Sequence, residues 1–326
     1  MSRQDVSTKV VYILGTARGG TSIFGRVLAT MQGAGHGGEL RRLWNPGLQP
    51  GHTCGCGKAP TDCPLWSKLL VAGSGAAYME PSLNEVARAQ DKAAPDDHAW
   101  WKAYRILRTS GDPGLETNEG RYLAAFSELY KAFARESGSS VVIDSSKNPA
   151  DAALLHRARD VAMYCLQIVR DPRGVAFSRR KRRAPDEPTR PAPGETARTA
   201  GYWIMQHLSF EAVRRRYGRQ RALLIRYEDF IEAPGAMVGA VARLVGTSPP
   251  ASDLSVGSPI ALPVSHEPDT TSTKFSAPQV VLRPDSRWVK ELHPVDRSMV
   301  TLLTYPLLRR YGYSVRAQSR TDHRPR

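Results

Sequence analysis

Cysteine and long hydrophobic runs are both scarce in this 326-residue sequence, and each scarcity excludes a class of protein. The four cysteines are too few for a small secreted scaffold held together by disulfides. No apolar run approaches the roughly 18 residues that a membrane span needs, so we expect no transmembrane segment. The first nine residues, Met1 to Lys9, are polar and lack the apolar region of a signal peptide, and we therefore expect a cytoplasmic protein.

Positive charge is what the sequence has in excess. There are 46 Lys and Arg residues against 31 Asp and Glu, a formal net charge of +15, while a hydrophobic content of 41% allows a sizeable core. This excess favours an anionic ligand: a nucleotide, a nucleic acid, a sulfated or phosphorylated molecule, or an acidic membrane. Charge alone does not choose among these ligands, so the choice depends on motifs.

Short apolar runs alternate with helical patterns along the chain. The pattern predicts strands at about residues 10–14, 141–143, 163–169 and 222–225. A helix from Thr21 follows the first strand, and prolines at the first helical position open helices after the second and third. This order is typical of an α/β fold, with a central parallel sheet flanked by helices.

We expect one domain over residues 1–326. Its core is predicted at about 10–313, with a mainly helical insertion at about 67–138 that would shape the acceptor side. Residues 184–194 combine prolines with mixed charges and predict a mobile surface loop. The polar residues 315–326 predict a flexible tail.

The strongest motif is the glycine-rich segment GTARGGTS at residues 15–22, between a predicted strand and helix. Glycines let successive backbone N–H groups point at one anion, and the helix N-terminus adds a positive dipole. The segment matches the phosphate-loop pattern G-x-x-x-x-G-K-[ST] except that threonine replaces the lysine that reaches a triphosphate. We therefore predict a phosphate-binding loop for a different ligand. Its candidate cofactor-binding residues are Arg18, Gly19, Gly20, Thr21 and Ser22.

A second basic segment follows the third predicted strand. Arg170 ends this strand, and Ser178 lies eight residues later on the following helix. An arginine and a nearby hydroxyl can together clamp a second phosphate, although a solvated basic helix face is the alternative for this pair alone. The cations at 179–183 continue that helix, and we interpret them as its exposed end, so no nucleic-acid partner is expected.

In this order, the two segments resemble the sulfotransferases that use 3′-phosphoadenosine 5′-phosphosulfate (PAPS). That family has a basic G-T/S loop for the 5′-phosphosulfate, and an arginine followed eight residues later by a serine for the 3′-phosphate. Residues 38–40, 144–149 and 225–229 resemble bacterial members of the carbohydrate or tyrosyl-protein type, and Cys54–Trp66 resembles bacterial members. The resemblance covers about residues 10–313 and implies a P-loop-NTPase-like sulfotransferase fold.

The resemblance also implies a catalytic base, because a hydroxyl acceptor is a poor nucleophile. Glu39 matches the glutamate base of the carbohydrate and tyrosyl-protein type members. His36 is the rival base, three residues earlier, and we favour Glu39 on its position in the family pattern.

Four further residues receive roles from the resemblance. Arg18 and Lys147 are expected to stabilise the charge on the departing phosphate oxygen. Tyr227 resembles the family's tyrosine on the adenine side. Lys274 is the candidate for a basic loop that contacts the 3′-phosphate near the C-terminus, where the usual arginine-bearing form is altered.

The cysteine-rich segment offers an alternative chemistry. His52, Cys54, Cys56 and Cys63 could supply four zinc ligands, but they lack a standard finger spacing. We expect thiols or a disulfide there in preference to zinc, and Cys165 as a buried small hydrophobe. Sulfuryl transfer demands no metal when arginine, lysine and backbone donors neutralise charge, so no metal ligand is predicted.

The sequence therefore predicts a sulfotransferase that moves the sulfuryl group from PAPS to a hydroxyl and releases adenosine 3′,5′-bisphosphate. We expect a small-molecule or glycan acceptor whose hydroxyl belongs to a glycan, a glycolipid or a natural product. The alternative is a nucleoside or sugar kinase with a degenerate phosphate loop, which should have lysine at position 21. A non-enzymatic nucleic-acid binder would leave the ordered pair of phosphate motifs unexplained.

Overall fold

The computed structural model describes residues 8–44, 52–70, 83–96, 99–183, 193–267 and 277–316. Three features predicted from the sequence fall wholly or mostly outside these ranges. They are the proline-rich loop as far as residue 192, the candidate 3′-phosphate ligand Lys274, and the tail from residue 317.

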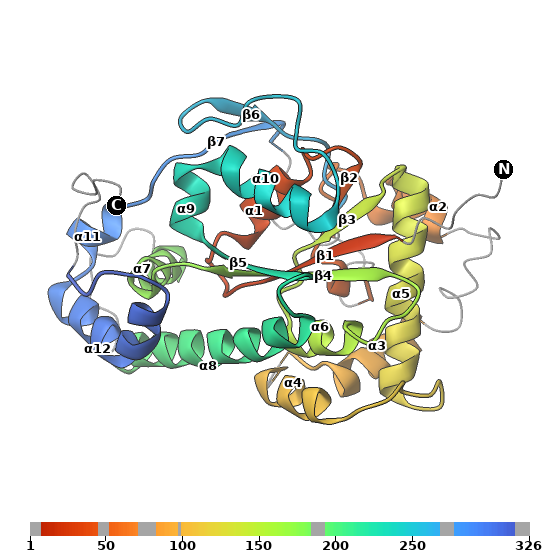
Figure 1. The fold of residues 1–326 in the computed structure, drawn as a ribbon, viewed down its shortest axis with the longest axis horizontal. Coiled ribbons are helices and arrows are strands. Elements are labelled where there is room, and N and C mark those ends of the chain that lie inside the picture. The colour runs from red at the N-terminus through yellow and green to blue at the C-terminus, as the bar shows by residue number, and fades with distance from the viewer. Residues whose placement is uncertain are drawn as a thin grey trace.

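Within the described residues, five parallel strands form a sheet at the centre of the molecule (Figure 1). Their order across the sheet is β2-β3-β1-β4-β5. Because every pair is parallel, the carboxyl ends of all five strands lie along one edge of the sheet, which we call the sheet edge. The strands are β1 (Lys9–Leu14), β2 (Ala34–Gly38), β3 (Val141–Asp144), β4 (Ala162–Val169) and β5 (Ala222–Arg226).

Helices cover both faces of this sheet, as the sequence predicted (Figure 1). The alternation of side chains along β1 defines the two cores: Val10, Tyr12 and Leu14 pack on one face, and Val11 and Ile13 on the other. The first face is covered by α5 (Asn118–Ser137), α6 (Pro149–Leu155) and α8 (Pro193–Tyr217). The second is covered by α1 (Thr21–Leu28), α9 (Tyr227–Glu232) and α10 (Pro234–Val245).

The remaining elements surround this layered centre. None of the described helices is both long and apolar enough to cross a membrane. The short 3₁₀ helices are η1 (Leu40–Arg42) and η3 (Pro60–Asp62), and an antiparallel pair is formed by β6 (Pro259–Ala261) and β7 (Gln279–Val281). The other helices are α2 (Trp66–Leu70), α3 (Leu83–Ala93), α4 (Ala99–Arg108), α7 (Pro172–Arg183), α11 (Arg287–Glu291) and α12 (Pro294–Arg310).

A buried carboxylate joins four of these elements. The side chain of Asp151 in α6 is fully buried and accepts hydrogen bonds from Tyr12 Oη of β1 and Tyr122 Oη of α5, both at 3.0 Å. Arg41 Nε of η1 donates to the same carboxylate at 2.9 Å. A buried charge needs such partners, because removing it from water is unfavourable. The network therefore fixes η1, which directly follows Glu39, against the sheet.

We expect Asp151→Ala to lower the free energy of unfolding by about 3–5 kcal/mol, because it leaves the buried Arg41 charge without its fully buried partner. Urea denaturation measures this change. The control is Asp160→Ala, which removes a carboxylate that is 48% exposed and 2.8 Å from Lys131 Nζ. That change should cost less than about 1 kcal/mol. Equal losses in the two variants would contradict the role given to the buried network.

Candidate functional site

The glycine-rich segment forms the turn between β1 and α1. Gly20 has φ 89° and lies so close to Tyr227 that a Cβ on it would be 2.2 Å from the tyrosine ring. In the described chain, no side chain caps the α1 N-terminus and its first turn holds no acidic residue. Thr21 and Ser22 begin this helix. The first-turn N–H groups and the two hydroxyls can therefore serve an anion.

The two basic segments predicted from the sequence lie in direct contact. Arg18 Nε donates to Ser178 Oγ of α7 at 2.9 Å. Arg170, at the end of β4, donates from Nη1 to the backbone carbonyl oxygen of Arg18 at 2.9 Å. Arg18 itself has φ 70°, a left-handed backbone conformation that is unfavourable for a residue other than glycine. Residues about 150 positions apart thus form one basic surface at the sheet edge.

Tyr227 extends this surface. It is the first residue of α9, directly after β5, and the Arg170 guanidinium lies 4.7 Å from the centroid of its ring. Burial raises the pKa of Tyr227, so the ring stays neutral. A flat neutral ring beside an arginine can stack against a base.

Arg170 has one partner that sequence reasoning missed. Its Nη2 lies 3.2 Å from Asp285 Oδ2, and Asp285 Oδ1 accepts from Arg287 Nε at 2.8 Å. The hydrogen bond from Arg287 lowers the pKa of Asp285, with Arg170 contributing, so the carboxylate is ionised at neutral pH. An anion that binds Arg170 therefore competes with Asp285 for one end of the guanidinium.

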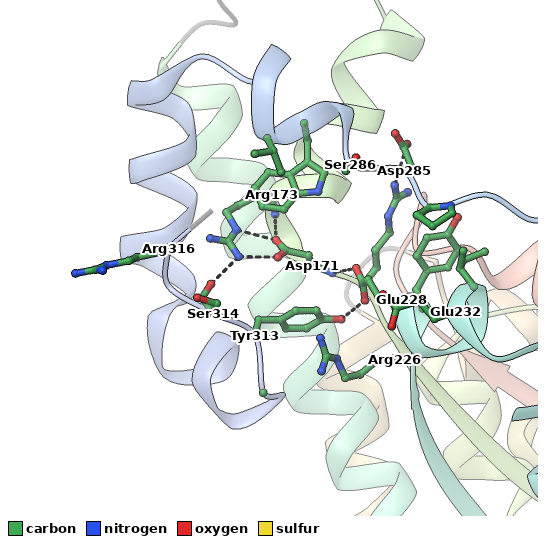
Figure 2. A pocket seen from close by; sticks show the side chains of 17 residues that line it. Asp171, Arg173, Arg226, Glu228, Glu232, Asp285, Ser286, Tyr313, Ser314 and Arg316 are labelled. Carbon is green, nitrogen blue, oxygen red and sulfur yellow. Dashed lines mark hydrogen bonds and ion pairs between the residues drawn. The ribbon is translucent and has the colours of Figure 1, made fainter. Parts of the chain in front are cut away.

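A cavity of about 120 Å³ is lined by Arg170 and by residues from the start of α7, from α9 and α11, and from the segment that follows α12 (Figure 2). Two of its charged groups, Arg173 and Asp171, pair with each other. Arg173 donates to both carboxylate oxygens of Asp171, at 2.9 and 2.7 Å, and to the backbone oxygen of Ser314 at 2.8 Å. We interpret this cavity wall as the frame that holds Arg170 in place.

Glu39 lies at the other end of the sheet edge, directly after β2. Its side chain is 18% exposed, with Oε1 paired to Lys147 Nζ and Oε2 accepting from Arg42 Nε at 2.9 Å. Burial by itself raises the pKa of Glu39, but the charges and hydrogen bonds of Lys147 and Arg42 outweigh it and lower the pKa overall. The carboxylate is therefore ionised at neutral pH and able to accept a proton.

The turn after β3 holds Lys147 against Glu39. Ser146 N donates to Asp144 Oδ1 at 2.8 Å, and Ser145 N donates to the Gly38 backbone oxygen at 2.7 Å. Lys147 adopts φ 67° in this turn. Such a conformation costs about 1–2 kcal/mol for a residue with a Cβ. Arg18 and Lys147 are the described non-glycine residues with positive φ, and both were nominated as charge-stabilising groups from the sequence.

His36, the rival base, is packed inside the fold. Its Nδ1 lies 2.9 Å from Ser265 Oγ, and a Cβ placed on Gly25 of α1 would be 2.8 Å from its Nε2. Burial, reinforced by Arg26 and Lys147, lowers the pKa of His36 to about 3. The ring is thus neutral at pH 7 and faces α1.

Glu267 is a buried acidic residue beside the site that sequence reasoning missed. Its side chain packs against Gly38, where an added Cβ would be 2.2 Å from Glu267 Cγ. Burial and the neighbouring charge of Glu39 raise its pKa to about 7. Nothing in the local sequence around residue 267 signals this position, because the contact joins the chain after β6 to the end of β2.

A comparison with known protein families identifies the family of this chain. Residues 11–250 match the Sulfotransferase family, and the chain therefore belongs to that family. This match and the parallel sheet confirm the family and the P-loop-like sulfotransferase fold expected from the two basic segments. The assignment makes the protein a transferase.

Three solved structures are similar to the chain over most of their length, and no curated protein matches it. The sulfotransferase domain from the Synechococcus PCC 7002 olefin synthase is 17% identical, with 94% of this chain and 95% of that one covered and a TM-score of 0.44. The sulfotransferase domain from the curacin biosynthetic pathway is 13% identical, with 94% of this chain and 98% of that one covered and a TM-score of 0.49. A sulfotransferase from Alicyclobacillus acidocaldarius is 17% identical, with 94% of this chain and 97% of that one covered and a TM-score of 0.36.

Proposed function

We propose that this sulfotransferase takes its sulfuryl group from PAPS and transfers it to a hydroxyl acceptor, releasing adenosine 3′,5′-bisphosphate. The observation that carries the proposal is the contact of Arg18 with both Ser178 and Arg170. It joins the phosphate loop to a second cationic group at the same edge. PAPS has one anionic group for each: the 5′-phosphosulfate for the loop and the 3′-phosphate for Arg170 and Ser178.

The residues around these contacts fit that donor. The uncapped N-terminus of α1 and the Arg18 side chain offer donors for a phosphosulfate. Tyr227 offers a ring face for the adenine, beside Arg170. A 3′-phosphate would replace Asp285 as the acceptor at Arg170 Nη2, one ionised acceptor for another.

In the proposed reaction, Glu39 removes the proton from the acceptor hydroxyl as its oxygen forms a bond to sulfur. The bond between sulfur and the bridging phosphate oxygen breaks, and the negative charge moves to that oxygen. Lys147 and Arg18 stabilise this charge as it develops. The proton stays on Glu39 until it is lost to solvent.

The acceptor proposed is a hydroxyl of a glycan, a glycolipid or a natural product. Incubation with ³⁵S-labelled PAPS and representatives of each class tests this choice. Label transfer to one class identifies the acceptor. Binding of adenosine 3′,5′-bisphosphate without transfer to any of the three would contradict the acceptor assignment and leave the donor assignment standing.

A binding experiment tests the donor assignment directly. Adenosine 3′,5′-bisphosphate at 100 times its Kd should stabilise the chain by about 2.7 kcal/mol in thermal unfolding, and ATP with magnesium should not. Arg170→Ala should weaken bisphosphate binding by about 2–3 kcal/mol, roughly 30- to 150-fold. Since Arg170 also holds the Arg18 carbonyl, the deciding quantity is the ratio of the Kd for adenosine 5′-monophosphate to that for the bisphosphate. A general loosening of the loop would raise both Kd values by the same factor and leave their ratio unchanged.

The ratio should collapse in Arg170→Ala and stay at its wild-type value in Lys181→Ala. Lys181 is a matched control because it is a cation on α7, the helix that carries Ser178, and it is paired with Glu291 at 2.7 Å. Equal ratios in all three proteins would mean that Arg170 does not recognise a 3′-phosphate. Stabilisation by ATP with magnesium would instead support a kinase.

A further inference from the structure

Three cysteines and a histidine meet at a place that the proposed reaction does not use. One ligand atom from each of Cys54, Cys56, Cys63 and His266 lies within 4.8 Å of all the others. His266 Nδ1 is 3.2 Å from Cys63 Sγ and 3.8 Å from Cys54 Sγ. In a tetrahedral zinc site with bonds of about 2.0–2.3 Å, neighbouring ligand atoms are about 3.3–3.8 Å apart. Shifts of roughly 1 Å or less would give that arrangement.

The backbone holds the two halves of this cluster together. Gly55 N donates to the Glu267 backbone oxygen at 2.9 Å, and a Cβ on Gly55 would be 2.7 Å from the Ser265 backbone oxygen. On the other side, Trp66 Nε1 donates to the His266 backbone oxygen at 2.9 Å. The histidine is therefore fixed between the two cysteine-bearing segments by contacts that do not depend on an ion.

We propose that Cys54, Cys56, Cys63 and His266 bind one Zn²⁺ ion as a structural site. Thiolate and imidazole ligands select zinc over magnesium or calcium, and four protein ligands leave no open position for catalysis. A disulfide would use two of the cysteines and leave the third and the histidine without a purpose. The proposal replaces both the His52 ligand considered from the sequence and the preference there for thiols or a disulfide.

The site has a consequence for the active centre. His266 directly precedes Glu267, whose side chain packs against Gly38 beside Glu39. The ion therefore ties the cysteine segment to the wall behind Glu39. Loss of zinc should lower thermal stability first and activity through it, since His266 is linked to Glu39 through Glu267 and Gly38.

Metal analysis of the reduced wild-type chain, purified from zinc-supplemented cells without chelators, tests the proposal. We expect about one zinc ion per chain. Exchange with Co²⁺ should give the visible absorption of tetrahedral cobalt and sulfur-to-cobalt charge-transfer bands. Chelation should lower Tm, and added Zn²⁺ should restore it. These measurements need no variant, so they remain decisive if a cysteine variant fails to fold.

Cys63→Ala and Cys165→Ala form the matched pair. Cys165 is buried in β4, outside the cluster, so Cys165→Ala should keep its zinc while Cys63→Ala loses it. A wild-type chain that contains no zinc and takes up neither Zn²⁺ nor Co²⁺ after reduction would overturn the proposal. So would a disulfide among Cys54, Cys56 and Cys63 in the purified protein, or equal zinc contents in the two variants.

Discussion

Replacing Glu39 by glutamine should lower kcat by about 10²- to 10⁴-fold while the Kd for adenosine 3′,5′-bisphosphate stays within about twofold. Glutamine keeps the size of the side chain and can still accept a hydrogen bond from Lys147, which pairs with Glu39 Oε1. It cannot take a proton from the acceptor hydroxyl. Initial rates with saturating PAPS, together with nucleotide titration, measure the two quantities separately.

His36→Asn is the control for this experiment. The asparagine amide can keep a hydrogen bond to Ser265, and the His36 ring faces α1. We expect a kcat within about threefold of wild type. An inactive His36→Asn of unchanged Tm, beside a fully active Glu39→Gln, would exchange the two roles.

The strands show which part of the fold can be predicted from local sequence. β1, β3, β4 and β5 are mainly apolar runs, and the structure confirms all four predicted strands. Ala34–Gly38 was not predicted as a strand, because three of its five residues are glycine and one is histidine. It becomes β2, the outermost strand, because it pairs with β3. Its glycines leave room for close neighbours, such as Glu267 beside Gly38.

The site divides in a similar way. Arg18 and Arg170 could be nominated because each follows a strand, and parallel strands bring such positions to one edge. Ser178 could be nominated with them because it lies on the helix that follows Arg170. Asp285 and His266 could not, because each lies in an irregular segment of the C-terminal third and reaches its partners through tertiary contacts alone. Sequence proximity pointed to His52 as a possible ligand beside the cysteines, whereas the structure brings His266 to them.

The second large effect is expected for Lys147→Met, which should lower the maximal kcat by about 10²- to 10³-fold and move the acidic limb of the pH–rate profile to higher pH. The first change follows from losing the cation proposed to stabilise the leaving oxygen. The second follows from Glu39, which works as a base only when ionised. Lys147 is the main group that lowers its pKa against the opposing effect of burial. Without Lys147, burial is opposed mainly by Arg42, so the pKa of Glu39 rises and more of the enzyme is inactive at a given acidic pH.

Arg42→Met separates these two contributions. Arg42 pairs with the other Glu39 oxygen at 2.9 Å, and its own side chain is 46% exposed, so water screens its charge more. This variant should move the acidic limb in the same direction by less, and its rate at high pH should reach the wild-type plateau. If Lys147→Met also reached that plateau, Lys147 would only tune the base and would not act on the leaving group. If its acidic limb did not move at all, Glu39 would not be the group that titrates in the rate profile.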